Sequence, residues 1–417
     1  MASPRNPTTT PPPRRKYDIV VFGATGYTGK LTCETILKHA PSSLRWAIAG
    51  RSPQRLELLQ HEWNRSYPDR VPVQTFICDL SEVQIEALVK ATALLITTVG
   101  PYIRYGTPVL EACAVYGTHY VDCTGEYPWT YEMVKRCHKT AKNRGAIIIP
   151  QCGVESAPAD LSTWALIKAV REGFNTGTGK VTFALHKIKG KTSGGTFETV
   201  LNLFETATLQ ELHESSRYNS ICPAKAPEQP YQYPVRRDPD LGFVSPSISG
   251  TADRVQVFRS WGLFDSGVYY GENFIWSEVL QRRNRAHAIV TWLVLNILGV
   301  CMIVAPLRWI LKKIRPFAPG EGPNEEQRKN NMIEYHGIAE ADDDSETPRK
   351  AFVNFKGPDP YEVTAILMVE VALAILHDKN SLARKLGGGV LTPATVASPH
   401  LIQRLDRAGI HIETKLF

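Results

Sequence analysis

A short run with three evenly spaced glycines stands near the start of the chain, in Gly23-Ala-Thr-Gly-Tyr-Thr-Gly29. The β-branched and aromatic run before it, residues 17–22, is typical of a buried strand, and residues 30–39 after it carry a rough helical stripe. Glycines at this point let the backbone turn tightly and approach a pyrophosphate, which then sits at the positive end of the helix. The spacing GxxGxxG is a variant common among NADP-dependent enzymes, so the run predicts a dinucleotide-binding turn. Its expected contacts are Gly23, Thr25, Gly26, Tyr27, Thr28 and Gly29.

The residue after the second predicted strand indicates whether the fold prefers NAD or NADP. Residues 44–50 form the next apolar run, and Arg51 follows it directly. NAD-selective folds usually place an Asp or Glu near this point for the ribose 2′-hydroxyl, whereas an Arg suits the 2′-phosphate through charge-assisted bonds. The alternative is that Arg51 only begins a solvated helix. The sequence predicts NADP(H) as the cofactor.

Turns after the next three predicted strands supply further cofactor contacts. Asp79 follows the strand at 73–78, at the place where adenine edges usually lie. Gly100 and Pro101 follow the strand at 93–99, and Thr124 and Glu126 follow the short strand at 119–122. Tight turns at the carboxyl ends of successive parallel strands are where such a fold holds its ligand.

Two tyrosines are candidate proton donors. Tyr102 and Tyr120 both stand beside strand ends that face the predicted cofactor. The alternative for each is an ordinary packing role. Glu126 and Glu155 are candidates to orient ribose or substrate, with a structural hydrogen bond as the alternative.

The alternation of strands and helices predicts an α/β fold with a Rossmann-type doubly wound parallel sheet. A second α+β domain follows, with a helix expected at 195–212 and long Pro-rich connections at 222–250. A strong amphipathic helix is expected at 361–376, and Gly145 is expected to cap the helix 129–144. The predicted divisions are a disordered basic leader (1–16), the NADP-binding domain (17–155), the substrate domain (156–285), a hydrophobic membrane-associating segment (286–316), a mobile loop (317–350) and a C-terminal return that completes the fold (351–417).

Composition excludes several classes of protein. The net charge of +7 over 417 residues is modest, and basic residues do not interleave with aromatics in one block, so we expect no nucleic-acid partner. Residues 1–16 lack the apolar core of a secretory signal. The eight cysteines show no CxxC or metal spacing, and nothing converges on Asp342-Asp343-Asp344, so we predict no metal site and reduced thiols in a cytosolic setting.

One segment is long and apolar enough to meet a membrane. Residues 288–307 contain no charge, and arginines and lysines stand on both flanks. That length just suffices to cross a bilayer, but positive charge on both sides sets no orientation. Basic flanks suit a segment that dips into a lipid surface and returns. A single crossing and a buried core helix are the alternatives.

Seven short motifs together resemble one family. The chain is similar to the saccharopine dehydrogenase-like oxidoreductases, a family that includes the trans-acting enoyl reductases of lipid and polyketide synthesis. The motifs are Gly23-Ala-Thr-Gly-Tyr-Thr-Gly29, Ala49-Gly-Arg51, Val99-Gly-Pro-Tyr102, Tyr120-Val-Asp-Cys-Thr-Gly-Glu126, Ser156-Ala-Pro-Ala-Asp160, Ser193-Gly-Gly-Thr196 and Gly388-Gly-Val-Leu-Thr-Pro393. Relatives commonly have Gly-Phe-Asp where this chain has Gly153-Val-Glu155, and its hydrophobic segment resembles that of the lipid-droplet-associated members.

The resemblance implies an NADP-dependent oxidoreductase. The favoured function is a trans-acting enoyl reductase that acts on an acyl or polyketide intermediate, either free or tethered to a carrier, at the cytoplasmic face of a membrane or lipid droplet. One alternative is an amino-acid dehydrogenase of the saccharopine type, although the basic groups that would hold its carboxylates are not identified in the sequence. The other is a lipid-surface protein that binds the cofactor without turnover. A homodimer is left open as a further partner.

Overall fold

The computed structural model describes residues 15–191, 193–313, 317–318, 320–343, 345 and 347–417. Most of the predicted leader, residues 1–14, lies outside the described residues. Its last part is anchored, because the Arg15 guanidinium donates hydrogen bonds to the carbonyl oxygens of Lys90 (2.5 Å) and Tyr116 (2.6 Å).

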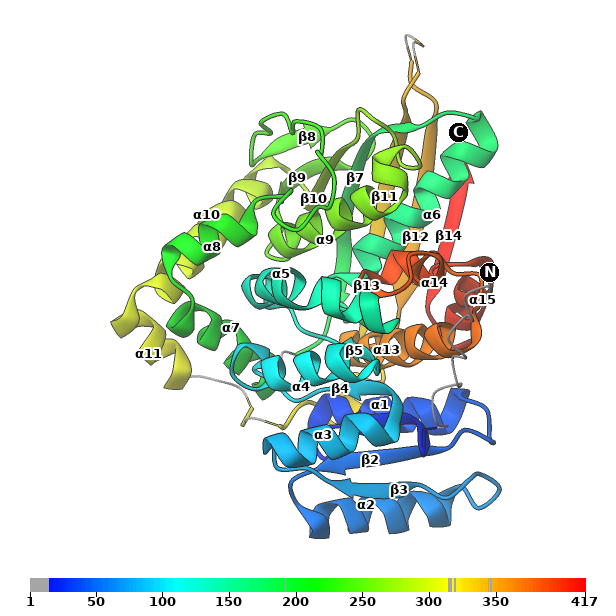
Figure 1. Cartoon of the computed structure of the whole chain (residues 1–417). Coiled ribbons are helices and arrows are strands. Elements are labelled where there is room, and N and C mark those ends of the chain that lie inside the picture. The colour runs from blue at the N-terminus through cyan, green and yellow to red at the C-terminus, as the bar shows by residue number, and fades with distance from the viewer. Residues whose placement is uncertain (1–14, 192, 314–316, 319, 344, 346) are drawn as a thin grey trace, which may run out of the picture.

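The first sheet has seven parallel strands in the order β13-β6-β5-β4-β1-β2-β3, so the Rossmann-type prediction is confirmed (Figure 1). Residues of α1, α2 and α13 pack on one face of this sheet and residues of α3, α4 and α5 on the other. The strands are β1 (Tyr17–Phe22), β2 (Trp46–Gly50), β3 (Gln74–Ile77), β4 (Thr92–Thr97), β5 (His119–Asp122), β6 (Ile147–Ile149) and β13 (Gly389–Val390). The helices are α1 (Tyr27–His39), α2 (Pro53–Ser66), α3 (Glu82–Ala91), α4 (Tyr102–Tyr116), α5 (Tyr127–Arg144) and α13 (Pro360–His377).

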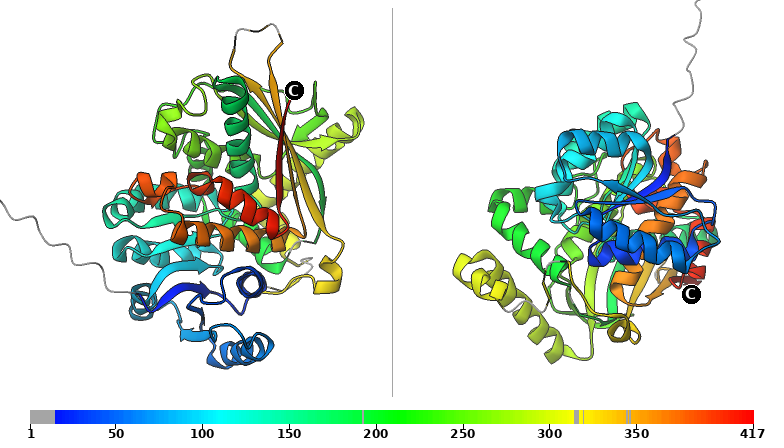
Figure 2. Two further views of the ribbon diagram at one scale, coloured as in Figure 1. Left: turned by 90° about the vertical axis from the view of Figure 1, so that its right-hand side faces the viewer. Right: turned by 90° about the horizontal axis from the view of Figure 1, so that it is seen from below.

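The second sheet also has seven strands, in the order β14-β12-β11-β7-β10-β9-β8, and is mostly antiparallel. Helices α6 and α9 pack against it, and β14 runs along its edge (Figure 2). The strands are β7 (Thr178–Lys189), β8 (Arg236–Asp238), β9 (Gly242–Pro246), β10 (Ile275–Arg282), β11 (Met332–Ala341), β12 (Lys350–Gly357) and β14 (His411–Leu416). The remaining helices are α6 (Ala157–Phe174), α7 (Gly194–Thr206), α8 (Leu209–Ser216), α9 (Gly250–Leu263), α10 (Arg285–Ile303), α11 (Ala305–Lys313), α12 (Glu325–Arg328), α14 (Leu382–Lys385) and α15 (Pro399–Arg407).

Residues 317–350 are not a single mobile loop, and that prediction is wrong. Residues 332–341 form β11, which lies between β7 and β12 inside the second sheet. Its buried residues alternate with Glu334, His336 and Glu340 as in a half-buried strand, but the Pro-rich and acidic flanks led to the prediction of a loop. Strands β12 and β14 of the C-terminal return join the second sheet while β13 joins the first, so this segment completes both domains.

Three other expectations about elements need correction. The helix at 361–376 is not amphipathic, because α13 is buried on nearly every side against α1, β4, β5 and α15. The single helix expected at 195–212 is two helices, since the hydroxyl of Thr208 caps the start of α8. The connection at 222–250 contains β8 and β9. Gly145 does end α5 in the left-handed conformation, as predicted.

Candidate functional site

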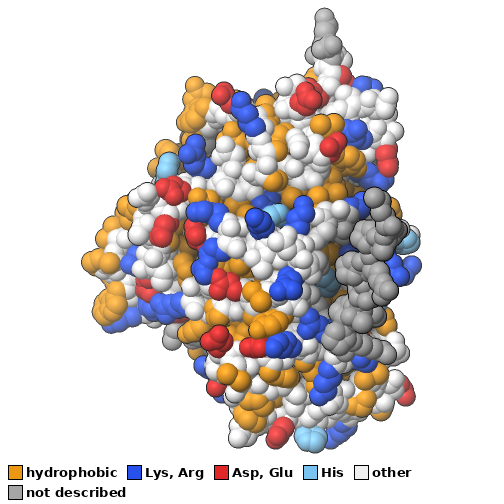
Figure 3. Space-filling model, in the orientation of Figure 1, with side chains coloured by type: hydrophobic (Ala, Val, Ile, Leu, Met, Phe, Trp, Pro, Cys, Tyr) orange, Lys and Arg blue, Asp and Glu red, His pale blue; other side chains and the backbone are white. Residues whose placement is uncertain are grey.

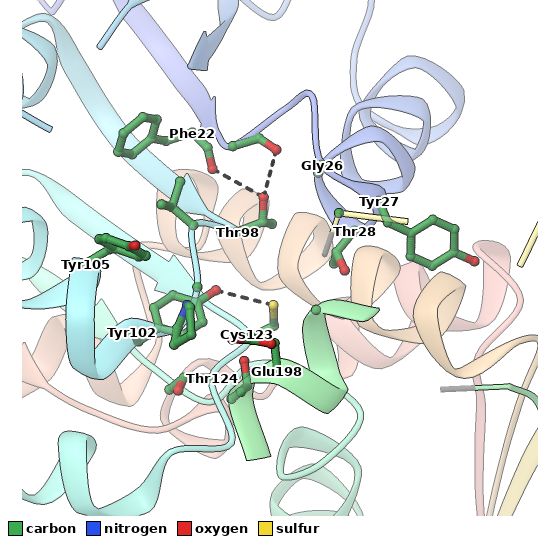
Figure 4. Close-up of a pocket in the computed structure, with 18 of the residues that line it drawn as sticks. Phe22, Gly26, Tyr27, Thr28, Thr98, Tyr102, Tyr105, Cys123, Thr124 and Glu198 are labelled. Carbon is green, nitrogen blue, oxygen red and sulfur yellow. Dashed lines mark hydrogen bonds between the residues drawn. The ribbon is translucent and has the colours of Figure 1, made fainter. Parts of the chain in front are cut away.

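A cavity of about 410 Å³ opens at the carboxyl ends of β1, β2 and β4 (Figure 4). It lies on the Rossmann sheet at the place where such folds hold a dinucleotide, and residues of α7 cover it from the second domain. Most of the residues predicted to bind the cofactor line it: Gly23, Thr25, Gly26, Tyr27, Thr28, Gly29, Arg51, Asp79, Gly100, Pro101 and Thr124.

The glycine turn has the shape that a pyrophosphate requires. Gly23 has φ +93°, and a Cβ on Gly29 would lie 2.1 Å from the carbonyl oxygen of Gly23, so neither position accepts a side chain without rearrangement. Helix α1 begins at this turn with no side-chain cap on Gly26 and no acidic residue in its first turn. Its first backbone N–H groups are therefore left to bind an anion. The residues present fit a dinucleotide phosphate.

Arg51 and Asp79 stand where the adenosine end of a dinucleotide would lie. Arg51 is exposed on the cavity wall, and among the described residues its side chain has no hydrogen-bond or ion-pair partner. The guanidinium is thus available for a 2′-phosphate, although Arg51 also precedes α2, as the alternative proposed. Hydrogen bonds from Ser81 hold the pKa of the Asp79 carboxyl below its usual value, so Asp79 is ionised at neutral pH.

The turns after β1 and β4 are tied together. The Thr98 hydroxyl lies 3.3 Å from the carbonyl oxygen of Phe22 and 3.2 Å from that of Gly23 (Figure 4). The Gly100–Pro101 peptide is cis, and Pro101 precedes the first residue of α4. The Thr98 contacts hold the turn after β1 beside the segment that leads to Gly100 and Pro101.

Glu126 lies behind the cavity wall, so the structure does not place it in contact with the cofactor. Its two carboxylate oxygens accept hydrogen bonds from the backbone N–H groups of Tyr102 and Ile103, both at 2.8 Å. Burial raises its pKa to about 7. Glu126 therefore holds the start of α4 beside the Gly100–Pro101 turn, which is the structural alternative that the sequence left open.

The two candidate proton donors point away from the cavity. Tyr120 is fully buried, does not line the cavity, and donates its hydroxyl proton to Asp122 at 2.7 Å. The ring of Tyr102 lines the cavity, but its hydroxyl donates to the carbonyl oxygen of Thr97 at 2.9 Å and lies 3.5 Å from the Cys123 sulfur (Figure 4). Burial raises the pKa of both hydroxyls well above its usual value. The packing role is the one that the geometry supports for both residues.

Glu155 is the titratable side chain that best fits proton transfer. It lines the first cavity and also a second one of about 230 Å³, and Thr28, Cys123 and Thr196 line both as well. Its carboxyl group packs over Gly125, where a Cβ would lie 2.0 Å from the Glu155 Oε2 atom. No described residue forms a hydrogen bond with this carboxyl group. Burial, and then the charge of Glu278, raise its pKa, so the protonated form persists to higher pH.

The second cavity brings in residues that the sequence analysis did not select as site residues. Tyr361, from the start of α13, accepts a hydrogen bond from the Ser193 backbone N–H at 2.6 Å, and its hydroxyl lies 2.9 Å from the Thr196 hydroxyl. Val154, Ile188 and Pro360 supply apolar surface. The motif Ser193-Gly-Gly-Thr196 was the available signal for this wall, but Tyr361 follows it by more than a hundred residues and carries no local signature.

Comparisons with known proteins agree with this site. Residues 19–149 match the saccharopine dehydrogenase NADP-binding domain. A putative trans-acting enoyl reductase of Mycobacterium tuberculosis is 32% identical, covering 98% of this chain and 99% of that protein. A trans-acting enoyl reductase of Mycobacterium bovis is 30% identical over 97% of this chain and 99% of its own length. The chain belongs to the trans-acting enoyl reductase family.

This family member is an NADP-dependent oxidoreductase, and the predicted cofactor is confirmed. Its fold is similar to that of apo saccharopine dehydrogenase (L-Glu forming) from Saccharomyces cerevisiae, with a TM-score of 0.54 and 11% identity, covering 96% of this chain and 100% of the yeast chain. At that level of identity the likeness concerns the fold.

Proposed function

We propose that this enzyme reduces the carbon–carbon double bond of an α,β-unsaturated acyl or polyketide thioester, with the acyl group carried by another protein. The observation that carries the proposal is the position of Glu155, whose carboxyl group lies at the junction of the cofactor cavity and the second cavity without a hydrogen-bond partner among the described residues. The names of the full-length relatives support the same reaction.

Different residues serve hydride transfer, protonation and the exclusion of water. The glycine turn and Arg51 would hold NADPH, which would supply the hydride that the β-carbon takes up. Glu155 supplies the proton that the α-carbon takes up, and its carboxylate regains a proton from water afterwards. The apolar wall of Val154, Ile188 and Pro360 keeps water from the reacting carbons.

The substrate carbonyl oxygen gains negative charge during this reaction and needs a hydrogen-bond donor. The Tyr361 oxygen accepts a hydrogen bond from the Ser193 N–H, and the Thr196 Oγ1 atom lies 2.9 Å from the Tyr361 hydroxyl and 3.2 Å from the Ser193 hydroxyl. We assign Tyr361 and Ser193 as the donors in these two pairs, which leaves the Thr196 hydroxyl proton for an oxygen in the cavity that Thr196 lines. We assign Thr196 as the donor to the carbonyl oxygen and Tyr361 as the residue that positions it.

The amino-acid dehydrogenase alternative has less support. A substrate such as saccharopine presents several carboxylates, which need cationic side chains around them. Among the described residues lining the two cavities, Arg51 and Lys191 are the only lysines or arginines, and Arg51 stands at the adenosine end. The apolar second cavity suits an acyl chain better.

A substrate panel tests the reaction. Purified enzyme is given NADPH with enoyl thioesters of increasing chain length, or NADP⁺ with saccharopine, and absorbance at the cofactor's reduced-form band is followed. We expect NADPH consumption with the thioesters alone. Turnover of saccharopine alone would overturn the proposal, and tight NADPH binding without any turnover would favour the non-catalytic alternative.

We also propose that helices α10 and α11 dock on a lipid surface at the cytoplasmic face of a membrane or lipid droplet. α10 is not a core helix, since of its residues only Ala288 and Met302 are buried. Hydrophobic side chains gather at the left edge of the molecule, where these helices lie (Figure 3). The exposed apolar residues are Ile289, Val290, Leu293, Val294, Ile297, Val300, Ile303, Val304, Leu307, Trp309 and Ile310.

Two features favour docking along the surface over a crossing. α10 packs on β9 and β10, and α11 folds back to pack on α7, so the pair is held at both ends. Basic residues at both ends, such as Arg285 and Lys313, suit the level of the head groups. Because α7 also covers the cofactor cavity, docking would bring that cavity close to lipid. The eight free cysteines agree with a reducing cytosolic setting.

Vesicle flotation tests the docking. The full chain is expected to float with vesicles of phosphatidylcholine and phosphatidylserine, and the double substitution Leu293→Glu/Ile297→Glu should abolish flotation because it buries charge at the apolar boundary. Leu58→Glu, on the exposed face of α2, is the matched control and should float normally. If the unaltered protein remains with the unbound fraction, the docking proposal is wrong.

A further inference from the structure

A cluster of metal-ligand side chains lies on the second sheet, outside the cofactor site. His186 comes from β7, and Glu334 and His336 come from the neighbouring strand β11. One ligand atom from each residue lies within 4.8 Å of the other two. The cluster borders a small apolar group that includes Ala184, Ile338 and Phe352, and the ring centroids of His336 and Phe352 are 5.4 Å apart.

A chain of hydrogen bonds from β10 fixes which nitrogen of His186 is available. The Gln281 side-chain nitrogen donates to the carbonyl oxygen of Leu241 at 2.8 Å, so the Gln281 Oε1 atom must face the other way. That oxygen lies 2.7 Å from the His186 Nδ1 atom, and because it can only accept, Nδ1 must carry the proton. The Nε2 atom of His186 therefore keeps a lone pair. This is the arrangement by which an outer hydrogen bond orients a histidine that ligates a metal.

A β-bulge places His186 beside Glu334 and His336. Glu334 pairs with Lys187 and Tyr335 with Leu185, so His186 is the extra residue between them. The imidazole rings of His186 and His336 stack with centroids 4.1 Å apart and an angle of 19° between their planes. The His336 Nε2 atom lies 3.3 Å from the Glu334 Oε1 atom. Two imidazoles and a carboxylate thus meet on two hydrogen-bonded strands of the sheet.

We propose that His186, Glu334 and His336 form a binding site for Zn²⁺ or a chemically similar divalent transition-metal ion, with Gln281 as the positioning residue. Imidazole nitrogens and a carboxylate oxygen are ligands that zinc takes at about 2.0–2.2 Å, and three protein ligands leave a fourth position for water. The ligand atoms lie within 4.8 Å of one another, so the side chains would rotate to close around an ion. The three ligands come from two strands that are far apart in the sequence. Neither the cysteine spacing nor the acidic triplet of the sequence therefore indicated the site.

An ion bound at this site would stabilise the end of β7, because the site lies close to that end. His186 stands two residues before Ile188, which lines the second cavity, and β7 continues only to Lys189. An ion that bridges β7 and β11 would brace this strand end. The proposal does not depend on the enoyl reductase activity, because metal binding is measured without substrate.

Titration of the chelator-treated full chain with Zn²⁺, followed by calorimetry, tests the proposal. We expect one equivalent to bind, with binding lost in His186→Ala and His336→Ala. Gln281→Ala should weaken it by about 10- to 100-fold, as is typical when an outer hydrogen-bond partner of a ligand is removed. His213→Ala, on the exposed surface of α8, is the matched control and should bind as the unaltered chain does.

A spectroscopic measurement keeps the test independent of variant folding. Co²⁺ added to the unaltered chain should give the intense visible absorption of a four-coordinate site, and Zn²⁺ should displace it. Circular dichroism confirms that each variant is folded. The proposal is overturned if the unaltered chain binds no ion, or if the folded variants His186→Ala and His336→Ala bind Zn²⁺ as tightly as the control.

Discussion

Replacing Glu155 by glutamine is expected to lower kcat for enoyl-thioester reduction by about 10²- to 10⁴-fold, the usual contribution of a positioned general acid. The amide keeps the size of the side chain and its contact with Gly125 but has no acidic proton to transfer. NADPH affinity should stay within about twofold, since the glycine turn and Arg51 hold the cofactor. Stopped-flow kinetics and a fluorescence titration of NADPH measure the two quantities separately.

The pH dependence gives an independent check on Glu155. The proton donor is the protonated carboxyl group, so kcat should fall as pH rises through its pKa, which burial and the nearby Glu278 have raised. The residual activity of Glu155→Gln should lack this descending limb. Glu155→Asp, which keeps the carboxyl group on a side chain one methylene shorter, should restore part of kcat together with the limb. A Glu155→Gln variant with kcat within threefold of the unaltered enzyme would show that another group delivers the proton.

Replacing Arg51 by alanine is expected to weaken NADPH binding by about tenfold and to leave NADH binding unchanged. A hydrogen-bonded charge pair contributes about 1.5 kcal/mol or more, and the exposure of Arg51 places the effect at the lower end of that range. Only NADPH carries the 2′-phosphate, so the loss should be specific to it. Because the interaction is exposed, the difference should also shrink as salt is added.

The matched control for Arg51 is Arg55→Ala. Arg55 is also exposed, stands four residues later on α2, and does not line the cavity. Fluorescence titration should therefore give unchanged affinities for both cofactors. Equal losses of NADPH affinity in the two variants would mean that general positive charge, and not contact with the 2′-phosphate, is responsible.

The cofactor half of the site was predictable because its signals are local. The glycine turn, Arg51 and the Gly100–Pro101 turn each follow directly on an apolar strand, and parallel strands bring their carboxyl ends to one edge. The alternation of strands and helices also indicated the parallel Rossmann-type sheet, because this alternation allows few topologies.

The reaction half was less predictable because it is assembled from distant segments. Glu155, Thr196 and Tyr361 come from three parts of the chain, and only the packing of the second domain brings them to the same cavity. Tyrosines beside strand ends looked suitable as donors, but the direction of a hydroxyl group depends on its neighbours, and those of Tyr102 and Tyr120 point into the protein. Strand β11 was missed because the Pro, Gly and charged residues on both sides of it dominate the composition of 317–350, although its buried and polar residues alternate as in a half-buried strand.

The most direct test of the central claim is to locate the added hydrogens in the product. A butenoyl thioester is reduced in D₂O with unlabelled NADPH, and the saturated product is analysed by mass spectrometry and NMR. We predict a single deuterium on the α-carbon, where a solvent-exchanged Glu155 proton arrives, and a hydrogen from NADPH on the β-carbon. No saturated product, or solvent deuterium on the β-carbon, would contradict the assignment of this enzyme as an enoyl reductase that uses the Glu155 site.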